Sequence, residues 1–286
     1  MRYLLCRQSF GRSVVLPQRN FRTSQMLLEI QNLRITYPIH GRQPFVAVDG
    51  VSLSVGAGES FGIVGESGCG KTSLARTIIG IHPPTSGTIR FEGADITRMT
   101  PPQFKAYRRA AQMVFQDAAD SLNPRMTVRQ TLEEVLRVHD MRPPDQIRPR
   151  VLELLDCVGL PHDTLDAYPR EISGGQCQRV SFARCLALEP RLIIADEPVS
   201  ALDVSVQARI LNLIRALQKD LNLAIILISH DLAVVRNICD RVAVMHSGTF
   251  VEQGPAAEVM EHPQHPYTRD LLNAVPDINR ALRQRR

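Results

Sequence analysis

The sequence predicts an α/β fold built on a parallel sheet, and three segments carry this prediction. An apolar run at residues 61–64 leads into a glycine-rich turn and then into a helix-like run at residues 72–79. Two more apolar runs, residues 192–195 and 223–228, each end in polar residues. Short, dense apolar runs are typical of strands buried on both faces of a parallel sheet. Ligand sites of such sheets lie at the carboxyl ends of the strands, so the residues that follow each run are candidates for a site.

The glycine-rich turn has the spacing G-x-x-x-x-G-K-T over residues 65–72. Glycines let successive backbone N–H groups point at phosphate oxygens, and the following helix adds its N-terminal dipole. Lys71 can reach the β- and γ-phosphates, and the Thr72 hydroxyl is placed to ligate Mg²⁺. A chance glycine-rich turn is the alternative, but the strand before it and the helix after it argue against that. The predicted nucleotide-binding residues here are Gly65, Glu66, Ser67, Gly68, Cys69, Gly70, Lys71, Thr72 and Ser73.

Four polar residues follow predicted strands and are candidates for catalysis or metal binding. Gln116 follows the strand at residues 112–115 and could contact both Mg²⁺ and an attacking water. Asp196 suits Mg²⁺, and Glu197 suits a general base that polarises water. His230 follows the run at residues 223–229; a lone histidine is more often structural, but this position favours a γ-phosphate contact.

Two further segments could contact a nucleotide. Residues 118–190 have helical spacing and form a helical insertion between strands, which ends at a turn before another helix. That turn can be an anion-binding helix start with a serine cap, and an ordinary capped loop is the open alternative. The residues of the turn are Ser173, Gly174, Gly175 and Gln176. Tyr37, between early strands, could stack on a purine ring or could simply cover a sheet edge.

Charge and composition limit the function classes. Residues 1–25 and 280–286 hold nine arginines and no acid, so removing these charges from the net +5 leaves −4 for residues 26–279. An acidic body does not favour a nucleic-acid partner. The apolar runs are far shorter than the ~20 residues of a membrane span, so we expect no crossing of a bilayer by this chain. The six cysteines include no C-x-x-C pair, and their scatter fits a reducing compartment.

Residues 1–26 lack any core-forming periodicity, and the strand pattern begins near Leu27. Their composition is that of a mitochondrial presequence, but a disordered extension, or a true start at Met26, is the simpler interpretation. We expect this extension to be disordered and dispensable.

The motifs together, in order, make the chain resemble the nucleotide-binding subunit of an ABC transporter over residues 28–251. The resemblance includes ISGGQ at 172–176, LIIADE at 192–197 and SALD at 200–203. Longer strings are similar to the peptide/nickel importer branch of the family, at residues 114–128, 168–179, 196–208 and 262–268. Longer members continue into a cysteine-containing tail, whereas this chain has no cysteine after Cys239, so no iron–sulfur role is carried over.

The resemblance implies a P-loop NTPase core of ABC type at residues 27–251, a helical subdomain at about 118–190 and a shortened C-terminal extension at 252–286. It implies ATP hydrolysis with ATP between two ATPase subunits, so that Lys71, Thr72 and Asp196 of one face the turn at 173–175 of the other. Glu197 would activate water, His230 would sense the γ-phosphate, and Gln116 would link the site to the membrane subunits.

The implied partners are two integral membrane permease subunits, a sister ATPase or second copy, and a periplasmic or extracellular substrate-binding protein. The implied location is the cytoplasmic face of the bacterial inner membrane, as a peripheral protein. Import of short peptides is the leading interpretation. Nickel or metal-chelate import, and a soluble ABC ATPase outside transport, are the alternatives.

Overall fold

The computed structural model describes residues 3–6, 14–17, 26–41, 43–200 and 202–274. A six-stranded sheet forms its centre. Five neighbouring strands of this sheet run parallel to one another, and the sixth, at one edge, runs antiparallel to its neighbour. The order is β8 (Ala111–Val114), β9 (Leu192–Asp196), β10 (Ala224–Ser229), β5 (Ser60–Val64), β11 (Arg241–His246) and β12 (Thr249–Pro255).

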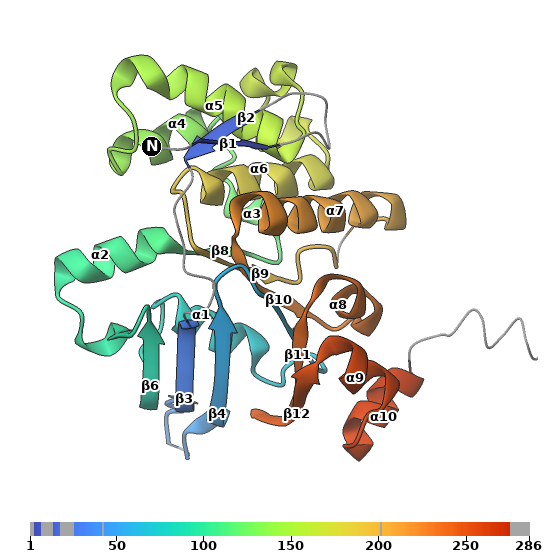
Figure 1. Ribbon diagram of the computed structural model, residues 1–286. Helices are drawn as coiled ribbons and strands as arrows, with labels where there is room; N and C mark the ends of the chain where they lie inside the picture. The colour runs from blue at the N-terminus through green and yellow to red at the C-terminus, as the bar shows by residue number, and fades with distance from the viewer. Residues whose placement is uncertain (1–2, 7–13, 18–25, 42, 201, 275–286) are drawn as a thin grey trace, which may run out of the picture.

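A second, antiparallel sheet packs beside the central one (Figure 1). Its order is β4 (Phe45–Gly56), β3 (Met26–Tyr37), β6 (Ser86–Phe91) and β7 (Ala94–Asp95). The strand pattern that begins near Leu27 alternates over residues 28–30 and again over 33–35, and both stretches belong to the single strand β3, whose pairing with β4 shifts register at several points. Irregular pairing of this kind bends a strand and lets it continue past a break in the alternation of apolar residues.

Helices cover both faces of the central sheet, and those of the expected helical insertion gather at one end of the molecule (Figure 1). The insertion contains α3 (Ala118–Ser121), α4 (Val128–Val138), α5 (Pro144–Val158) and α6 (Gly174–Leu186). The remaining helices are α1 (Lys71–Ile78), α2 (Pro101–Ala110), α7 (Val204–Leu221), α8 (Leu232–Ile238), α9 (Ala256–Glu261) and α10 (Pro266–Asn273). Among the helices of the described ranges, none combines the length and apolar character of a membrane span.

The buried strands divide their side chains between two cores. Ile193 and Ala195 of β9 join the core that includes the helical insertion, whereas Leu192 and Ile194 join the core around α1 and the antiparallel sheet. Side chains of a strand alternate between faces, so a strand covered on both sides must be apolar throughout. This packing explains the unbroken apolar runs. Because the neighbouring strands are parallel, their carboxyl ends lie at the same edge of the sheet.

The predicted extension includes two described strands, β1 (Tyr3–Cys6) and β2 (Val14–Pro17), which pair antiparallel. β1 lies against α7 and β2 lies against α5. The other residues of 1–25 lie outside the described ranges, so the expectation of a disordered, dispensable extension stays a prediction.

Candidate nucleotide-binding and hydrolysis site

The phosphate-binding loop connects β5 to α1, and its shape depends on glycine. Gly65 has φ 155° and Gly70 has φ 110°, a region that side chains rarely adopt. A Cβ on Gly70 would lie 2.2 Å from the carbonyl oxygen of Ala47, and one on Gly65 would lie 2.2 Å from that of Met245. The loop is therefore packed directly against the backbone of β4 and β11, and this contact holds its curvature.

Lys71 begins α1 and lies over its own loop. Its ammonium group donates hydrogen bonds to the carbonyl oxygens of Gly65 at 2.8 Å and Glu66 at 2.6 Å, and the side chain is buried. The Cys69 sulfur lies 3.6 Å from the same nitrogen. The loop thus presents a fixed positive charge together with backbone N–H groups, the combination that binds phosphate.

Asp196 ends β9 and is 2% exposed, and its Oδ1 atom has no hydrogen-bond partner. Burial raises the pKa of this carboxyl group, and the hydrogen bond from the Thr72 side chain opposes the rise. A buried carboxylate oxygen without a partner, next to a hydroxyl group, suits a hard cation with oxygen ligands. The residues present at this position therefore fit Mg²⁺.

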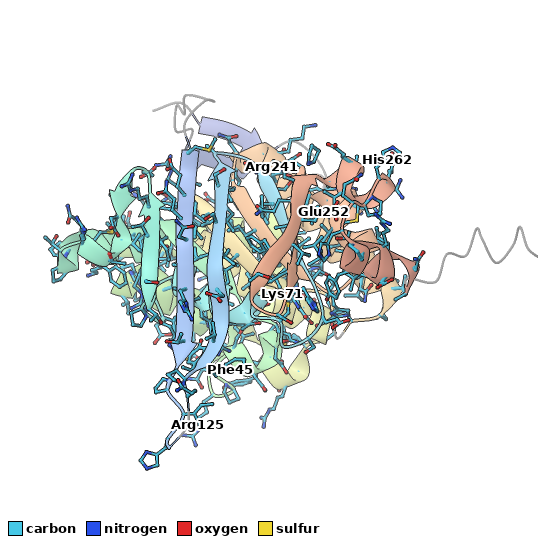
Figure 2. All side chains as sticks on the ribbon, turned by 90° about the horizontal axis from the view of Figure 1, so that it is seen from below. Phe45, Lys71, Arg125, Arg241, Glu252 and His262 are labelled. Carbon is cyan, nitrogen blue, oxygen red and sulfur yellow. The ribbon has the colours of Figure 1, made fainter. Side chains whose placement is uncertain are left out.

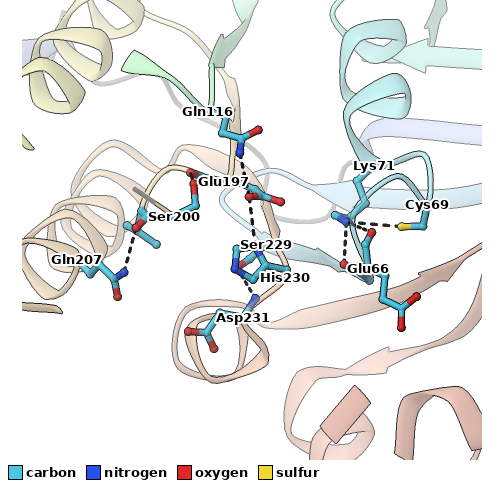
Figure 3. A network of polar contacts seen from close by, with 12 residues as sticks. Glu66, Cys69, Lys71, Gln116, Glu197, Ser200, Gln207, Ser229, His230 and Asp231 are labelled. Atoms are coloured by element: carbon cyan, nitrogen blue, oxygen red, sulfur yellow. Dashed lines mark hydrogen bonds and ion pairs between the residues drawn. The ribbon is translucent and has the colours of Figure 1, made fainter. Parts of the chain in front are cut away.

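Glu197 stands at the centre of a polar cluster that converges from three strand ends (Figure 3). Gln116, which follows β8 and Phe115, donates from Nε2 to Glu197 Oε2 at 3.3 Å. His230, directly after β10, places Nδ1 3.2 Å from the same oxygen. The sequence had assigned all three residues to catalysis, and the structure brings them together.

The backbone of Glu197 is itself unusual. Its φ of 45° lies in the left-handed region, which costs free energy for a residue with a side chain. Its N–H donates to the carbonyl oxygen of Ile228 on β10 at 3.0 Å. The neighbouring strand therefore holds this turn and aims the carboxylate towards the loop side of the sheet.

A cavity of ≈ 650 Å³ lies over the loop and the cluster. It is lined by nearly all of the predicted loop residues, by Gln116, Glu197 and His230, and by Phe45, Ala47, Leu271 and Ala274. A second cavity of ≈ 500 Å³ adjoins it and contains Thr72, Asp196 and Gln116. The three predicted metal residues therefore share one space.

Two predicted nucleotide contacts lie elsewhere. Tyr37 makes an edge-on contact with His82 at 5.8 Å between ring centroids and does not line the cavity, whereas its cross-strand partner Phe45 does. The turn before α6 also lies outside the cavity lining. There Ser173 and Gln176 bond each other reciprocally: Gln176 N–H donates to Ser173 Oγ at 3.3 Å, and Ser173 N–H donates to Gln176 Oε1 at 2.9 Å.

Four residues of the cavity lining are not among the predicted ones: Phe45, Ala47, Leu271 and Ala274. Phe45 offered one signal, since it is an aromatic residue close to the loop in the chain. Leu271 and Ala274 offered none, because they lie about 200 residues beyond the loop and only folding brings them to the cavity.

Comparison with known proteins shows the family of the chain. The family model described as "ABC transporter" matches residues 48–200, which is more than half of the chain. The chain belongs to the ABC transporter family. A second model, "Oligopeptide/dipeptide transporter, C-terminal region", matches residues 251–286.

Curated relatives agree with this membership. The oligopeptide transport ATP-binding protein OppF of Escherichia coli is 48% identical over 261 residues, covering 88% of this chain and 78% of the relative. The protein of the same name from Lactococcus lactis subsp. lactis is 44% identical over 259 residues, covering 88% of this chain and 81% of the relative.

Solved structures confirm the fold class predicted from the sequence. The cassette cbiO1 from Clostridium perfringens, part of an ABC transporter complex, has a TM-score of 0.75 at 29% identity and covers 91% of this chain and 100% of its own. The dimeric cassette MJ0796 bound to ADP and Pi has a TM-score of 0.71 at 28% identity and covers 80% and 99%. The chain is an ABC-type ATPase.

Proposed function

We propose that this ATPase powers the import of short peptides through separate membrane permease subunits. The observation that carries the proposal is the convergence of Gln116 and His230 on Glu197, beside a phosphate loop that already holds Lys71 in place. The match of residues 251–286 to the oligopeptide/dipeptide C-terminal region supports the choice of cargo.

In the proposed reaction, the loop N–H groups and Lys71 bind the triphosphate, and water attacks the γ-phosphorus. Glu197 accepts the proton of that water while the bond from the γ-phosphorus to the leaving ADP oxygen breaks. Gln116 holds the Glu197 carboxylate by donating to it, and His230 contacts the γ-phosphate. Positioning and electrostatics supply most of the catalysis in phosphoryl transfer, so fixed geometry matters more than covalent chemistry.

Thr72, Asp196 and Gln116 would hold Mg²⁺, which neutralises developing charge on the phosphates when bound. The unpaired Oδ1 of Asp196 supports this assignment. Burial raises the pKa of Asp196, and the charge of a bound cation would act in the opposite direction by stabilising the ionised carboxylate.

The turn at residues 173–176 supplies the second half of the site in this proposal, but to another ATPase subunit. None of its four residues lines the cavity of its own chain. Its N-terminal position on α6 gives it the backbone N–H groups and dipole that bind anions. A second copy or a sister ATPase would close over the loop with the equivalent turn.

A cavity of ≈ 690 Å³ between α2 and α4 supports a docking place for the permeases. The segment between Gln116 and α4 contributes Asn123 and Met126 to its lining, and α2 contributes Phe104 and Lys105. The segment starts at Gln116, which is hydrogen-bonded to Glu197. A movement of the segment can therefore be transmitted to the hydrolytic site. We also propose that the chain lies on the cytoplasmic face of the bacterial inner membrane, with a substrate-binding protein on the opposite side.

The test is transport by the whole complex. The chain is co-expressed with the permease, sister ATPase and binding-protein genes that neighbour its own, and the complex is reconstituted in vesicles. We expect ATP-dependent uptake of short peptides that a Lys71→Ala complex lacks. ATP-dependent uptake of nickel or a metal chelate, with no peptide uptake, would establish the alternative cargo. ATPase activity with no assembly onto permeases would support a soluble ABC ATPase.

A further inference from the structure

The C-terminal segment 262–274 is anchored by one carboxylate of the central sheet. Glu252 on β12 accepts hydrogen bonds from the N–H groups of Gln264 at 2.8 Å and His265 at 3.0 Å. Burial acts against ionisation of this group, but the hydrogen bonds from Gln264, Thr268 and His265 and the charge of His265 together outweigh it, so the pKa of Glu252 is lowered. Figure 2 shows Glu252 beside the C-terminal helices. The segment is thus fixed to the body just before α10 begins.

The start of α10 is fixed by its own side chains. His265 Nδ1 accepts from the N–H of Tyr267 at 3.2 Å, which caps the helix. Arg269 donates back to the carbonyl oxygens of Pro263 at 3.2 Å and Gln264 at 2.8 Å. These hydrogen bonds hold the turn before α10 and so fix the start of the helix, which orients the Tyr267 side chain.

Tyr267 reaches the phosphate loop. Its hydroxyl oxygen accepts a hydrogen bond from the N–H of Glu66 at 3.2 Å. Its ring packs against His246, the last residue of β11, with ring centroids 4.1 Å apart. Gly248, in the turn that follows, donates to the carbonyl oxygen of Cys69 at 3.0 Å. The loop is therefore braced from outside at both Glu66 and Cys69.

α10 also contributes to the cavity itself, because Leu271 and Ala274 line it together with the loop. Leu271 follows Tyr267 by four residues, so the two side chains lie on the same face of the helix. One face of α10 therefore both contacts the phosphate loop and closes one side of the cavity.

We propose that segment 262–274 is part of the nucleotide site: Tyr267 is a positioning residue for the phosphate loop, and Leu271 forms a wall of the nucleotide pocket. The ligand class is a nucleoside di- or triphosphate. The inference rests on ATP binding at the loop and not on the nature of the cargo. It gives the HPQHPYT string at residues 262–268 a physical role, which is to deliver Tyr267 to Glu66.

The first test compares Tyr267→Phe with Tyr107→Phe in the purified complex. Both changes remove one hydroxyl group that is hydrogen-bonded to the backbone. The Tyr267 hydroxyl accepts from the N–H of Glu66, and the Tyr107 hydroxyl donates to the carbonyl oxygen of Ile78, away from the cavity. We expect Tyr267→Phe to weaken ATP and ADP binding about 2- to 10-fold, the range of one net hydrogen bond. The KM for ATP should rise equally, with kcat at saturating ATP unchanged, and Tyr107→Phe should leave the dissociation constants unchanged.

Unchanged nucleotide affinity in Tyr267→Phe would overturn the positioning role, and so would equal weakening in both variants, which would indicate general destabilisation. A wild-type complex that binds no nucleotide would instead contradict the proposed function.

A second pair of variants tests whether Leu271 forms a wall of the nucleotide pocket. Leu271→Asp should weaken ATP binding more than Asn273→Asp, by about threefold or more, because only the first charge would line the cavity near the phosphates. Equal weakening by the two variants would show that Leu271 does not form a wall of the nucleotide pocket.

Discussion

The phosphate loop and the turn at residues 173–176 are both glycine-containing helix starts, but they are held in different ways. The loop is packed against β4 and β11 and is crossed by the Lys71 side chain. The turn is exposed at Ser173, and its side-chain hydrogen bonds, between Ser173 and Gln176, stay within the turn. The loop is built into the core, whereas the turn is exposed at Ser173 and Gly174 and packs against α7 at the buried Gly175.

In the proposed function the two regions are halves of one site that do not meet within a single chain, and the difference between them fits those two roles. A loop that orders a triphosphate must be rigid before binding, and the sheet supplies that rigidity. A turn that contacts the same triphosphate on another subunit must remain accessible until the subunits close. The following changes test this division, in order of expected effect.

Lys71→Ala should have the largest effect, because it removes the only side-chain charge within the phosphate loop that can neutralise phosphate. We expect ATP binding to weaken about 10- to 10²-fold, the range of a charge-assisted hydrogen bond, and hydrolysis to fall below detection. Isothermal titration and phosphate release would measure both. Lys219→Ala, an exposed lysine of α7, is the matched control. Normal hydrolysis by a folded Lys71→Ala complex would exclude the loop as the ATP site.

Gly174→Asp should separate the two regions. A Cβ at Gly174 would meet only Leu202 at 3.4 Å, whereas one at Gly175 would lie 2.4 Å from Val206, so position 174 accepts a side chain without repacking. We expect hydrolysis by the assembled complex to fall about 10²-fold, as for loss of a preorganised contact to the transition state. ATP binding by the isolated chain should not change. Weakened binding by the isolated chain would mean that the turn serves its own loop.

Asp196→Asn should have the smallest effect, on stability without nucleotide. Burial raises the pKa of Asp196 in the folded state, so the ionised carboxyl disfavours folding at neutral pH. The neutral amide should therefore raise Tm at pH 7, by about 2–4 °C for each kcal/mol regained. The gain should disappear below the ordinary aspartate pKa of 3.8, where Asp196 is protonated in both states. Asp163→Asn, at an exposed position, is the control, and a lowered Tm at pH 7 would contradict the account.

The sequence predicted the parts of the molecule whose signal is local. The β9 and β10 runs are apolar throughout because both faces are buried, and the residues after them meet in the site as expected. The helical spacing of residues 118–190 agrees with the helices that the structure shows there, among them α4, α5 and α6. Such elements carry their own periodicity and end signals.

The remaining features depend on contacts between distant residues, which no local pattern encodes. Tyr37 and Phe45 are cross-strand partners, but β4 and not β3 is the strand that packs against the phosphate loop, and this places Phe45 rather than Tyr37 at the cavity. The C-terminal string at 262–268 marked a branch of the family, yet its contact with Glu66 spans 201 residues of chain. Pairings at this separation follow from the tertiary fold, and so the site is larger than its motifs.

The most direct test of the account is Glu197→Gln in the assembled transporter, measured as ATP hydrolysis and as the lifetime of the ATP-dependent ATPase dimer. The amide keeps the size of the carboxylate but cannot accept a proton from water, and a positioned general base is worth roughly 10²- to 10⁴-fold in rate. ATP held by the loop of one subunit and the turn of the other should then keep the pair closed. Glu258→Gln, on the exposed face of α9, is the matched control. We predict slow hydrolysis with a long-lived dimer, and hydrolysis at the normal rate at the site that Glu197 lines would show that Glu197 is not the base.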